Sequence, residues 1–418
     1  MLDRKLLRKD PQIVVEAARA KNEKIDMEQW LEADANRRAL MLEIEELRKQ
    51  RNQLSKAVSI KRRAGENADE EMNKSREIGT KLGALESRVT EIDSLLASIE
   101  MSFPNIPDPD VPVGGEKDNV ILKTRGKVPE FNFQPKPHWE LMEDVFQPEA
   151  ASRIAGSNFI LFRGWAAKLQ RTLISWMLDY HIENGMEEVW APFVAKPESM
   201  TATAQLPKMD DDMYKIGRDD LYLIPTGEVP ITNLYRDQLL EETSLPVRLC
   251  GYTPCFRREA GSYGKDNRGL NRVHQFEKVE MVRLEHPERS EDAHLELLDH
   301  AVAMLELLGI PYRVLLLASG DLSFAAAKCF DIEIWSAGQE KWLEVSSISN
   351  FRDFQARRGN MRFRPAGGGK PRYIHTLNGS GLALPRLIIS LVENGQQADG
   401  SIKLPQVLAE RMGTEVIR

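Results

Sequence analysis

The stretch from Phe256 to Glu280, FRREAGSYGKDNRGLNRVHQFEKVE, decides the fold of the larger part of this chain. It holds six Lys or Arg residues and three glycines between two ends rich in strand-forming residues, and Phe276 lies near its close. The glycines at positions 261, 264 and 269 permit a wide, bent connection, because glycine adopts backbone conformations that other residues avoid. We therefore predict a long β-hairpin that presents cations and an aromatic ring to a polyphosphate ligand.

Side chains of this hairpin are expected to alternate between two faces, as they do along any strand. On that basis Arg257 and Glu259 point the same way, and so do Arg272, His274 and Phe276. A guanidinium group neutralises a phosphate through two parallel hydrogen bonds, and an aromatic ring offers a base a stacking surface. An isolated Phe-Arg-x-Glu is more often part of a surface hairpin with ion pairs, but the second cluster favours a binding site.

A segment near the C-terminus complements the hairpin. Residues His375 to Arg386, HTLNGSGLALPR, supply small residues, a serine hydroxyl and one more arginine. Glycine and serine allow a ligand to approach the backbone closely, while the arginine adds charge for a phosphate. The two segments together indicate an enzyme that uses ATP to activate another substrate.

The first hundred residues are predicted to be almost wholly helical, with an early break at Asp10-Pro11. Apolar residues in the second half of this region repeat at intervals of four and three, as in the seam of a coiled coil: Ile78, Leu82, Leu85, Val89, Ile92, Leu96 and Ile99. A similar seam precedes it, with Arg51 interrupting: Leu40, Ile44, Leu47, Leu54 and Val58. A polar turn at residues 63–68 separates the two, so we predict an antiparallel helical hairpin over about residues 37–101.

Charge is distributed unevenly over this helical hairpin. Nine Lys or Arg residues face only three acids between Arg37 and Arg63, whereas Glu66 to Glu100 holds nine acids and four bases. Most coiled-coil seams serve dimerisation or spacing, and charge runs are usually solvated faces. A one-sided basic helix can also lie along the phosphates of a nucleic acid. Both interpretations of the hairpin remain open at this point.

Four prolines in the ten residues from Phe103 to Pro112 end the helical region, because proline cannot continue a helix. We place a domain boundary there, with one domain at residues 1–103 and a second at 104–418. In the second domain short β-branched or aromatic runs alternate with a few long helices, such as Trp165 to Asn184 and Arg289 to Leu308. Strands joined by long hairpins and segregated helices predict an α+β domain with a mainly antiparallel sheet.

Composition narrows the class of protein. The chain of 418 residues is 42% hydrophobic and carries a net charge of −7, which argues against a protein that simply coats nucleic acid. No run approaches the ~20 apolar residues that span a bilayer, and the N-terminus lacks the apolar centre of a signal peptide. Only three cysteines occur, so a secreted disulfide framework is not expected. We expect a cytoplasmic enzyme with no membrane partner.

The motifs together resemble those of the class II aminoacyl-tRNA synthetases. The FRRE and RVHQF elements are similar to motif 2, Asn378 to Arg386 is similar to motif 3, and the helix from Trp165 to Asn184 is similar to the dimer-forming motif 1. Further segments resemble the seryl-tRNA synthetase family of the common bacterial type: LIPTGEVP (223–230), EVSSISN (344–350) with DFQARR (353–358), and HTLNGSG (375–381). The resemblance extends over essentially the whole chain, including the coiled-coil arm.

The resemblance implies a reaction and its partners. The family condenses L-serine with ATP to seryl-adenylate, releases pyrophosphate and passes serine to the 3′ end of serine tRNA, and charging of selenocysteine tRNA is also expected. It further implies a homodimer in which the arm of one subunit serves the active site of the other. One alternative is a seryl-type paralogue that charges a carrier protein; such relatives lack the long arm, which is present here. Two others are an inactive nucleotide-binding protein and a coiled-coil structural protein.

Roles for individual residues also come from the resemblance. The expected L-serine-binding residues are Thr226, Gly227, Glu228, Arg257, Glu280, Asn378 and Ser380. The expected ATP-binding residues are Arg257, Arg258, Glu259, Arg272, Val273, Phe276, Glu344, Val345, Ser346, Ser347 and Arg386. Mg²⁺ is expected at Glu344 and Ser347, whose hard oxygen atoms suit it. The residues expected to contact tRNA from the arm are Arg48, Lys49, Arg51, Lys56, Lys61, Arg62 and Arg63.

Several positions depart from the family pattern. Alanines flank Thr203 where glycine is commoner, and Gly227 stands where alanine is commoner. Divergent relatives hold a catalytic zinc through cysteines, but no cysteine lies in the motif 3 region here, so no zinc is expected and the thiols are predicted to be buried or idle. Cys329, Phe330, Ile348 and Gly395 also differ from the commoner residues, and none of these changes removes a charged ligand.

Overall fold

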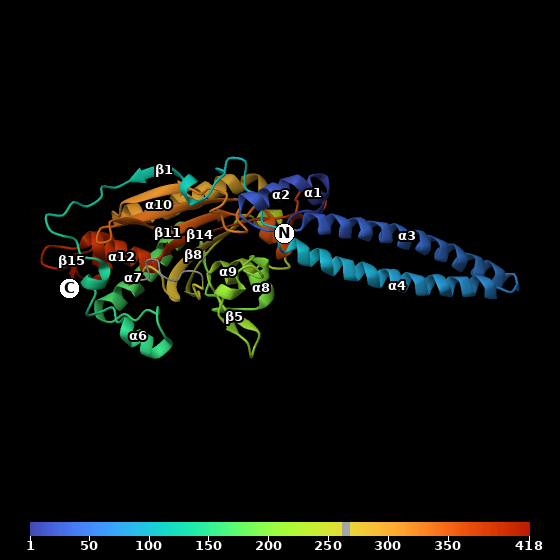
Figure 1. Cartoon of the computed structure of the whole chain (residues 1–418), viewed down its shortest axis with the longest axis horizontal. Helices are drawn as coiled ribbons and strands as arrows, with labels where there is room; N and C mark the ends of the chain where they lie inside the picture. The colour runs from blue at the N-terminus through green and yellow to red at the C-terminus, as the bar shows by residue number, and fades with distance from the viewer. Residues whose placement is uncertain (261–267) are drawn as a thin grey trace. The chain divides into compact units, whose positions relative to one another are not determined.

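The computed structural model describes residues 1–260 and 268–418, and its contacts divide the chain into two compact units, Leu2–Pro104 and Asn105–Arg418. The glycines predicted to bend the hairpin at positions 261 and 264 lie outside the described residues. Figure 1 shows the elements of both units. None of the helices in the described ranges is both long and apolar enough to cross a membrane.

The first unit is helical, as predicted. It comprises α1 (Arg4–Lys9), α2 (Pro11–Ala20), α3 (Met27–Arg63) and α4 (Asp69–Glu100). The break between α1 and α2 falls at Asp10, whose side chain accepts a hydrogen bond from the backbone N–H of Ile13. Pro11 occupies the first position of α2, where its missing N–H costs nothing.

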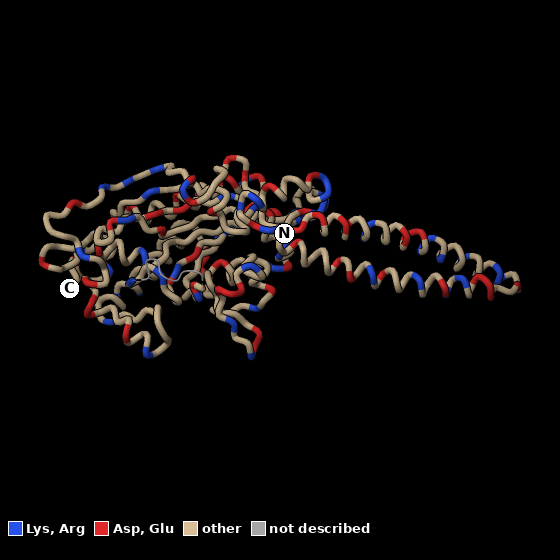
Figure 2. Tube along the Cα trace, in the orientation of Figure 1, with Lys and Arg blue, Asp and Glu red and all other residues tan. Residues whose placement is uncertain are grey.

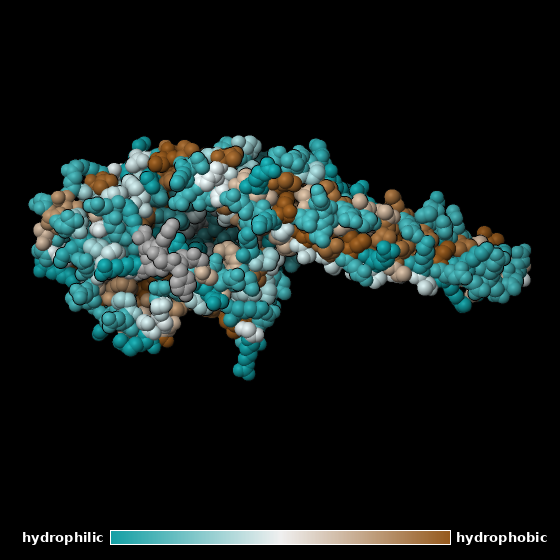
Figure 3. All heavy atoms as spheres, in the orientation of Figure 1, coloured by the Kyte–Doolittle hydropathy of each residue, from teal (hydrophilic) through white to brown (hydrophobic). Residues whose placement is uncertain are grey.

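The helices α3 and α4 form the predicted antiparallel coiled coil. Ile44 and Leu47 pack against Leu82 and Leu85 in a small buried cluster. Ion pairs join the helices on either side of this seam: Arg37 with Asp93 at 2.7 Å, Arg48 with Glu86 at 2.8 Å and Lys61 with Glu71 at 2.5 Å. Partners thus run in opposite directions along the two helices. Charged residues line both helices in Figure 2, and hydrophobic side chains follow the seam in Figure 3.

The second unit is built on an eight-stranded sheet with strand order β1-β9-β10-β11-β14-β8-β7-β2. The strands are β1 (Val120–Arg125), β9 (Tyr312–Leu316), β10 (Lys328–Ser336), β11 (Lys341–Asn350), β14 (His375–Ala383), β8 (Gln275–Glu285), β7 (Val247–Phe256) and β2 (Glu187–Glu188). Every neighbouring pair is antiparallel except β2 with β7. The prediction of a mainly antiparallel sheet in an α+β domain is therefore confirmed.

Helices and smaller sheets complete the unit. The helices are α5 (His138–Leu141), α6 (Pro148–Ala155), α7 (Gly164–Glu183), α8 (Pro197–Ala202), α9 (Glu228–Asn233), α10 (Ser290–Leu308), α11 (Phe354–Arg358), α12 (Leu384–Gly395) and α13 (Gln406–Met412). The remaining strands pair as β3 (Val194–Ala195), β5 (Leu221–Leu223) and β4 (Lys215–Ile216); as β13 (Arg372–Tyr373), β12 (Arg362–Arg364) and β6 (Leu239–Glu241); and as β15 (Ile402–Lys403) with β16 (Val416–Ile417). The two long helices predicted from sequence correspond to α7 and α10.

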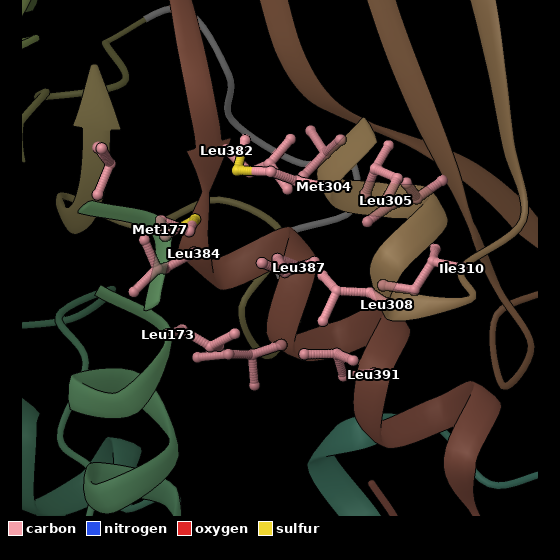
Figure 4. Packing of buried hydrophobic residues seen from close by; sticks show 14 of the residues in the cluster. Leu173, Met177, Met304, Leu305, Leu308, Ile310, Leu382, Leu384, Leu387 and Leu391 are labelled. Carbon is pink, nitrogen blue, oxygen red and sulfur yellow. The ribbon is translucent and has the colours of Figure 1, made fainter. Parts of the chain in front are cut away.

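The hydrophobic core lies between the sheet and three helices. Figure 4 shows Leu173 of α7, Leu387 of α12 and Leu308 of α10 converging in one buried cluster. The same cluster includes Val279 and Met281 of β8. Because side chains alternate along a strand, the residues between these two and on either side of them must emerge on the opposite face of the sheet. That second face carries the candidate site.

Candidate active site

A cavity of about 480 Å³ opens on the face of the sheet away from the core. Its walls come from β8, β11, β14, the start of α12 and the segments that flank β8 and α9. Arg257 and Arg386, which are far apart in the sequence, both line it. The central expectation from the sequence, that these two guanidinium groups share one cavity, is therefore met. A hollow is visible on this unit in Figure 3.

The β8 strand supplies the floor of the cavity by simple alternation. Phe276, Lys278 and Glu280 line the cavity, while Val279 and Met281 point into the core. Antiparallel pairing then sets Ser380 of β14 directly opposite Glu280. The register of these two strands thus fixes the polar residues at the inner end of the cavity.

The two strands of the predicted hairpin, β7 and β8, do not extend as far as the sequence prediction required. The strand β7 ends at Phe256, and β8 begins only at Gln275. Arg257, Glu259, Arg272 and His274 therefore lie outside regular strand, and the prediction that they share faces through strand alternation is wrong. The backbone at Glu259 has φ of 52°, which turns the chain away from the strand direction.

The cavity nevertheless brings most of these residues together. Arg257, Glu259, Arg272, Val273 and Phe276 all line it. The Arg257 guanidinium lies over the Phe276 ring at 5.2 Å, and its Nε donates to the carbonyl of Pro225 at 3.3 Å. His274 instead stacks on Phe159 and hydrogen-bonds the hydroxyl of Tyr214 at 2.6 Å.

Partly exposed charged groups that line the cavity are paired with one another. Arg272 donates to Glu259 at 2.9 Å. Arg386, in the first turn of α12, donates to the backbone carbonyl of Glu344 at 2.7 Å and lies 3.3 Å from its carboxylate. These pairs are partly exposed, so each contributes little to stability and can be replaced by a ligand at small cost.

The inner end of the cavity is a buried polar cluster centred on Glu280. Its carboxylate accepts hydrogen bonds of 3.0 Å from the Thr226 hydroxyl and from the Asn378 amide, and it forms an ion pair with Lys278. Lys278 also donates to Thr226 at 2.9 Å. A charged group is tolerated in a protein interior only when it is paired and hydrogen-bonded in this way. The cluster is suited to a small, polar substrate group.

Glu228 lies at the first position of α9 and also lines the cavity. It is buried, and burial together with the neighbouring charge of Glu280 raises the pKa of Glu228 to about 7. Gln355, Lys278 and Arg257 act in the opposite direction on this pKa. A cationic group that enters the cavity would stabilise the charged form of Glu228, because it would offset the effects of burial and of Glu280.

Three of the residues expected at the site do not line the cavity. Arg258 is exposed, and its backbone N–H donates to the carbonyl of Asp212 at 2.8 Å. Gly227 approaches β8 so closely that a Cβ atom there would lie 2.9 Å from the Cβ atom of Glu280. Ser346 is buried and donates to the carbonyl of Ser380 at 2.6 Å. Any ligand contacts of these three residues stay predictions.

The oxygen atoms expected to hold Mg²⁺ come from β11, where Glu344 and Ser347 line the cavity. Asp331 of β10 faces Ser347 directly across the strand pair, and burial together with the charge of Glu344 raises the pKa of Asp331 well above its ordinary value. Within the described residues no group of three or more His, Cys, Asp or Glu side chains is arranged to hold a metal. One carboxylate and one hydroxyl fit Mg²⁺, which keeps water and phosphate ligands.

Sequence reasoning missed several residues that line the cavity. Lys278 stands two residues before Glu280 on the same strand face, and this spacing was the available signal. Thr203 and Gln205 also reach the cavity. Between them Ala204 has φ of 70°, a left-handed conformation that costs a non-glycine residue roughly 1 kcal/mol. A glycine at this position would adopt the same conformation without that cost.

Two further sets of predicted residues can be placed. The three cysteines, Cys250, Cys255 and Cys329, are free and buried, as predicted.

In the helical unit Arg48 and Lys61 are paired with acids of α4, and Arg62 donates to the sulfur of Met72 at 3.1 Å. The remaining arm residues expected to contact tRNA are exposed: Lys49, Arg51, Lys56 and Arg63.

Comparison with known proteins identifies the class. A family model described as tRNA synthetase class II core domain (G, H, P, S and T) matches residues 212–395, the part of the chain that holds most of the cavity. A second, described as Seryl-tRNA synthetase N-terminal domain, matches residues 1–107. The fold and the site are those of a class II aminoacyl-tRNA synthetase.

Individual relatives narrow the class to a family. The chain is 48% identical over 417 residues to the serine–tRNA ligase of Thermomicrobium roseum, covering 99% of this chain and 94% of that one. It is 47% identical over 423 residues to the serine–tRNA ligase of Roseiflexus castenholzii, covering all of both. The crystal structure of seryl-tRNA synthetase from Pyrococcus horikoshii complexed with ATP matches with a TM-score of 0.94, at 36% identity over 100% of this chain and 99% of that one. The chain belongs to the serine–tRNA ligase family.

Proposed function

We propose that this protein activates L-serine with ATP in the cavity on the sheet and then transfers the serine to the 3′ end of serine tRNA. The single observation that carries the proposal is the meeting of Arg257 and Arg386 in one cavity with the buried carboxylates of Glu228 and Glu280. Cations at one end suit a triphosphate, and carboxylates at the other suit an amino acid's ammonium group and hydroxyl.

In the first step an oxygen of the serine carboxylate attacks the α-phosphorus of ATP. The bond from that phosphorus to the bridging oxygen breaks, and pyrophosphate leaves with the electron pair. No side chain needs to act as nucleophile, because the chemistry depends on holding two anions together and on neutralising charge at the phosphorus. Arg257, whose guanidinium lies over the Phe276 ring and whose charge acts on Glu228, supplies that charge.

The resemblance to the family suggests the roles of the remaining residues, and their presence in the lining of the cavity supports these roles. Glu228 receives the serine ammonium group, and the cluster of Glu280, Asn378 and Ser380 contacts the serine hydroxyl. A site that hydrogen-bonds a hydroxyl rejects an analogue without it by about 10⁴-fold or more, since its own polar groups are then left unpaired. Alanine is therefore excluded.

The other end of the cavity is assigned to ATP. Glu259 and the backbone of Val273 contact adenine, Phe276 stacks on the ring, and Arg272 and Arg386 bind the outer phosphates. Glu344 and Ser347 would hold Mg²⁺, which supplies charge neutralisation to the phosphate oxygens when bound. The similar structure from Pyrococcus horikoshii, which is complexed with ATP, supports ATP as the substrate.

In the second step the terminal ribose hydroxyl of tRNA attacks the carbonyl carbon of the adenylate, and AMP leaves. The basic, exposed side chains of α3 are assigned to the tRNA backbone. A homodimer with arms acting across subunits, a cytoplasmic location and the charging of selenocysteine tRNA belong to the same proposal. The comparisons give no support to a carrier-protein substrate.

The experiment that tests the proposal is aminoacylation by the purified full chain. The protein is incubated with ATP, Mg²⁺ and each radioactive amino acid in turn, first with unfractionated tRNA and then with single transcripts of serine and selenocysteine tRNA. Serine alone is expected to label tRNA, and the label is released by mild base, as an ester requires. Labelling of tRNA by another amino acid, or labelling of protein instead of tRNA, contradicts the proposal.

A further inference from the structure

Behind Glu228, outside the cavity itself, a side chain from α11 lies against the carboxylate. Gln355 is 1% exposed, and its Nε2 donates to Oε1 of Glu228 at 2.6 Å. The same nitrogen lies 3.4 Å from the carbonyl oxygen of Thr203. Gln355 is not among the residues that line the cavity. It therefore acts on any cavity ligand only through Glu228.

A second contact holds the Gln355 amide in place, and the Glu228 carboxylate decides which way it is turned. The hydroxyl of Thr376, on β14, donates to Oε1 of Gln355 at 2.7 Å. Turning the amide over would place its oxygen against the Glu228 carboxylate, so that two acceptors would face each other. The arrangement thus leaves the amide nitrogen on the side of Glu228, and both side chains are buried.

The other oxygen of Glu228 is held more loosely. Gln205 Nε2 lies 3.5 Å from Oε2 of Glu228, and Gln205 in turn accepts a hydrogen bond from the Thr203 hydroxyl. Because this contact is long, Gln355 provides the stronger hydrogen bond to the carboxylate. A charge-assisted hydrogen bond of this kind is about twice as strong as one between neutral groups.

We infer that Gln355 is a positioning residue for serine, which holds the Glu228 carboxylate charged and aimed into the cavity so that it receives the substrate's ammonium group. This inference rests on the proposed function and names a residue that acts behind the site. The groups that face Glu228 are the carboxylate of Glu280 and the cations of Lys278 and Arg257. Glu280 opposes the charge on Glu228, so the carboxylate depends on the donor that Gln355 supplies.

The test compares Gln355→Met with the wild type in serine-dependent exchange of pyrophosphate into ATP, from pH 6 to pH 9. Methionine has a similar length and no donor. We expect the KM for serine to rise roughly 10- to 100-fold near neutral pH, while the KM for ATP changes little. The acidic limb of the pH profile moves to higher pH, so that the serine KM recovers toward the wild-type value at the alkaline end.

Two matched variants make the outcome specific. Thr376→Val removes the orienting hydroxyl and leaves Gln355 in place, so it should shift the serine KM in the same direction by a smaller factor. Arg357→Met alters the neighbouring residue on α11, whose side chain pairs with Asp353 and Tyr373, and should leave the serine KM unchanged. If the Gln355→Met variant does not fold, the serine KM of the Thr376→Val variant tests the inference by itself.

The possible failures are distinguishable. Absence of serine-dependent exchange in the wild type contradicts the proposed function itself. Exchange in the wild type, with Gln355→Met showing the same serine KM and pH profile, overturns only the positioning role. A loss in Gln355→Met that affects serine and ATP equally and does not recover with pH also overturns it, because it would indicate general damage to the fold.

Discussion

Arg272 donates a 2.9 Å hydrogen bond to Glu259, so two residues proposed to bind opposite ends of ATP bind each other across the mouth of the cavity. Glu259 and Arg272 are 22% and 46% exposed, which makes the pair a weak contributor to stability. ATP binding is expected to separate them, because adenine and the outer phosphates lie at different places in the cavity.

A double-mutant cycle tests this separation. Arg272→Ala and Glu259→Ala should each raise the KM for ATP by about tenfold, since each removes one charged hydrogen bond to the nucleotide. In the double variant the loss should be at least the sum of the two single losses, because each single variant already removes the ion pair that ATP would otherwise have to break. A double variant no worse than either single variant would mean that the ion pair itself is the functional unit.

Serine binding should depend on pH through Glu228. Its folded-state pKa, raised to about 7 from an ordinary value of 4.5 by burial and by Glu280, means that the folded chain holds this proton more tightly than the unfolded chain. The group therefore favours the folded state as pH falls from about 7 toward 4.5. Over the same range the carboxylate is lost, and the dissociation constant for serine should rise about tenfold per pH unit.

Equilibrium binding of serine measured by calorimetry from pH 5.5 to pH 8 checks this dependence. Glu228→Gln serves as the control: it should bind serine weakly at every pH and lose the dependence between pH 5.5 and 7. A wild-type dissociation constant that stays flat across this range would show that Glu228 does not titrate as described.

Lys278 should matter for stability as well as for the reaction. It pairs with Glu280 at the floor of the cavity, and both side chains are almost fully buried. Lys278→Met leaves a buried carboxylate without its cation, a change that typically costs about 3–5 kcal/mol. Urea unfolding at neutral pH should show that loss. A loss under about 1 kcal/mol would contradict the pairing.

The proposed contact between the arm and tRNA can be tested by comparing variants of its two helices. Lys49→Ala with Lys56→Ala removes two exposed cations from α3, and Arg76→Ala with Arg88→Ala removes two from α4. The α3 double variant should raise the KM for tRNA and lower the dependence of tRNA binding on salt by about two ions. Serine activation should not change in either variant. Equal effects on tRNA from both helices would contradict a one-sided arm.

Much of the architecture followed from the sequence because its signals are local. The apolar spacing from Ile78 to Ile99 predicted the coiled coil, and Asp10-Pro11 predicted the break between α1 and α2. The residue types at Arg257, Phe276 and Arg386 predicted a shared cavity. These features depend on periodicity, proline geometry and charge, which can be recognised without a fold.

The errors and omissions have a different origin. Alternation failed at Glu259 because β7 ends at Phe256, where the backbone N–H of Arg257 instead bonds the carbonyl of His274. The sequence predicts no role for Gln355, because its partner Glu228 lies far away in the sequence and meets it only through tertiary packing. Arg258 was expected to bind ATP from the family resemblance, but it lies outside the cavity although it adjoins Arg257 in the sequence. Sequence proximity is a poor guide to which side chains share a site.

The proposed reaction depends most on Arg257, which is assigned contacts with both serine and ATP. The direct measurement is serine-dependent exchange of pyrophosphate into ATP by the wild type, by Arg257→Ala and by a control, Arg268→Ala, whose guanidinium lies 4.7 Å from the Trp139 ring centroid and does not line the cavity. We predict exchange in the wild type and the control, and a loss of roughly 10³-fold in Arg257→Ala. Exchange near the wild-type rate in Arg257→Ala would contradict the account.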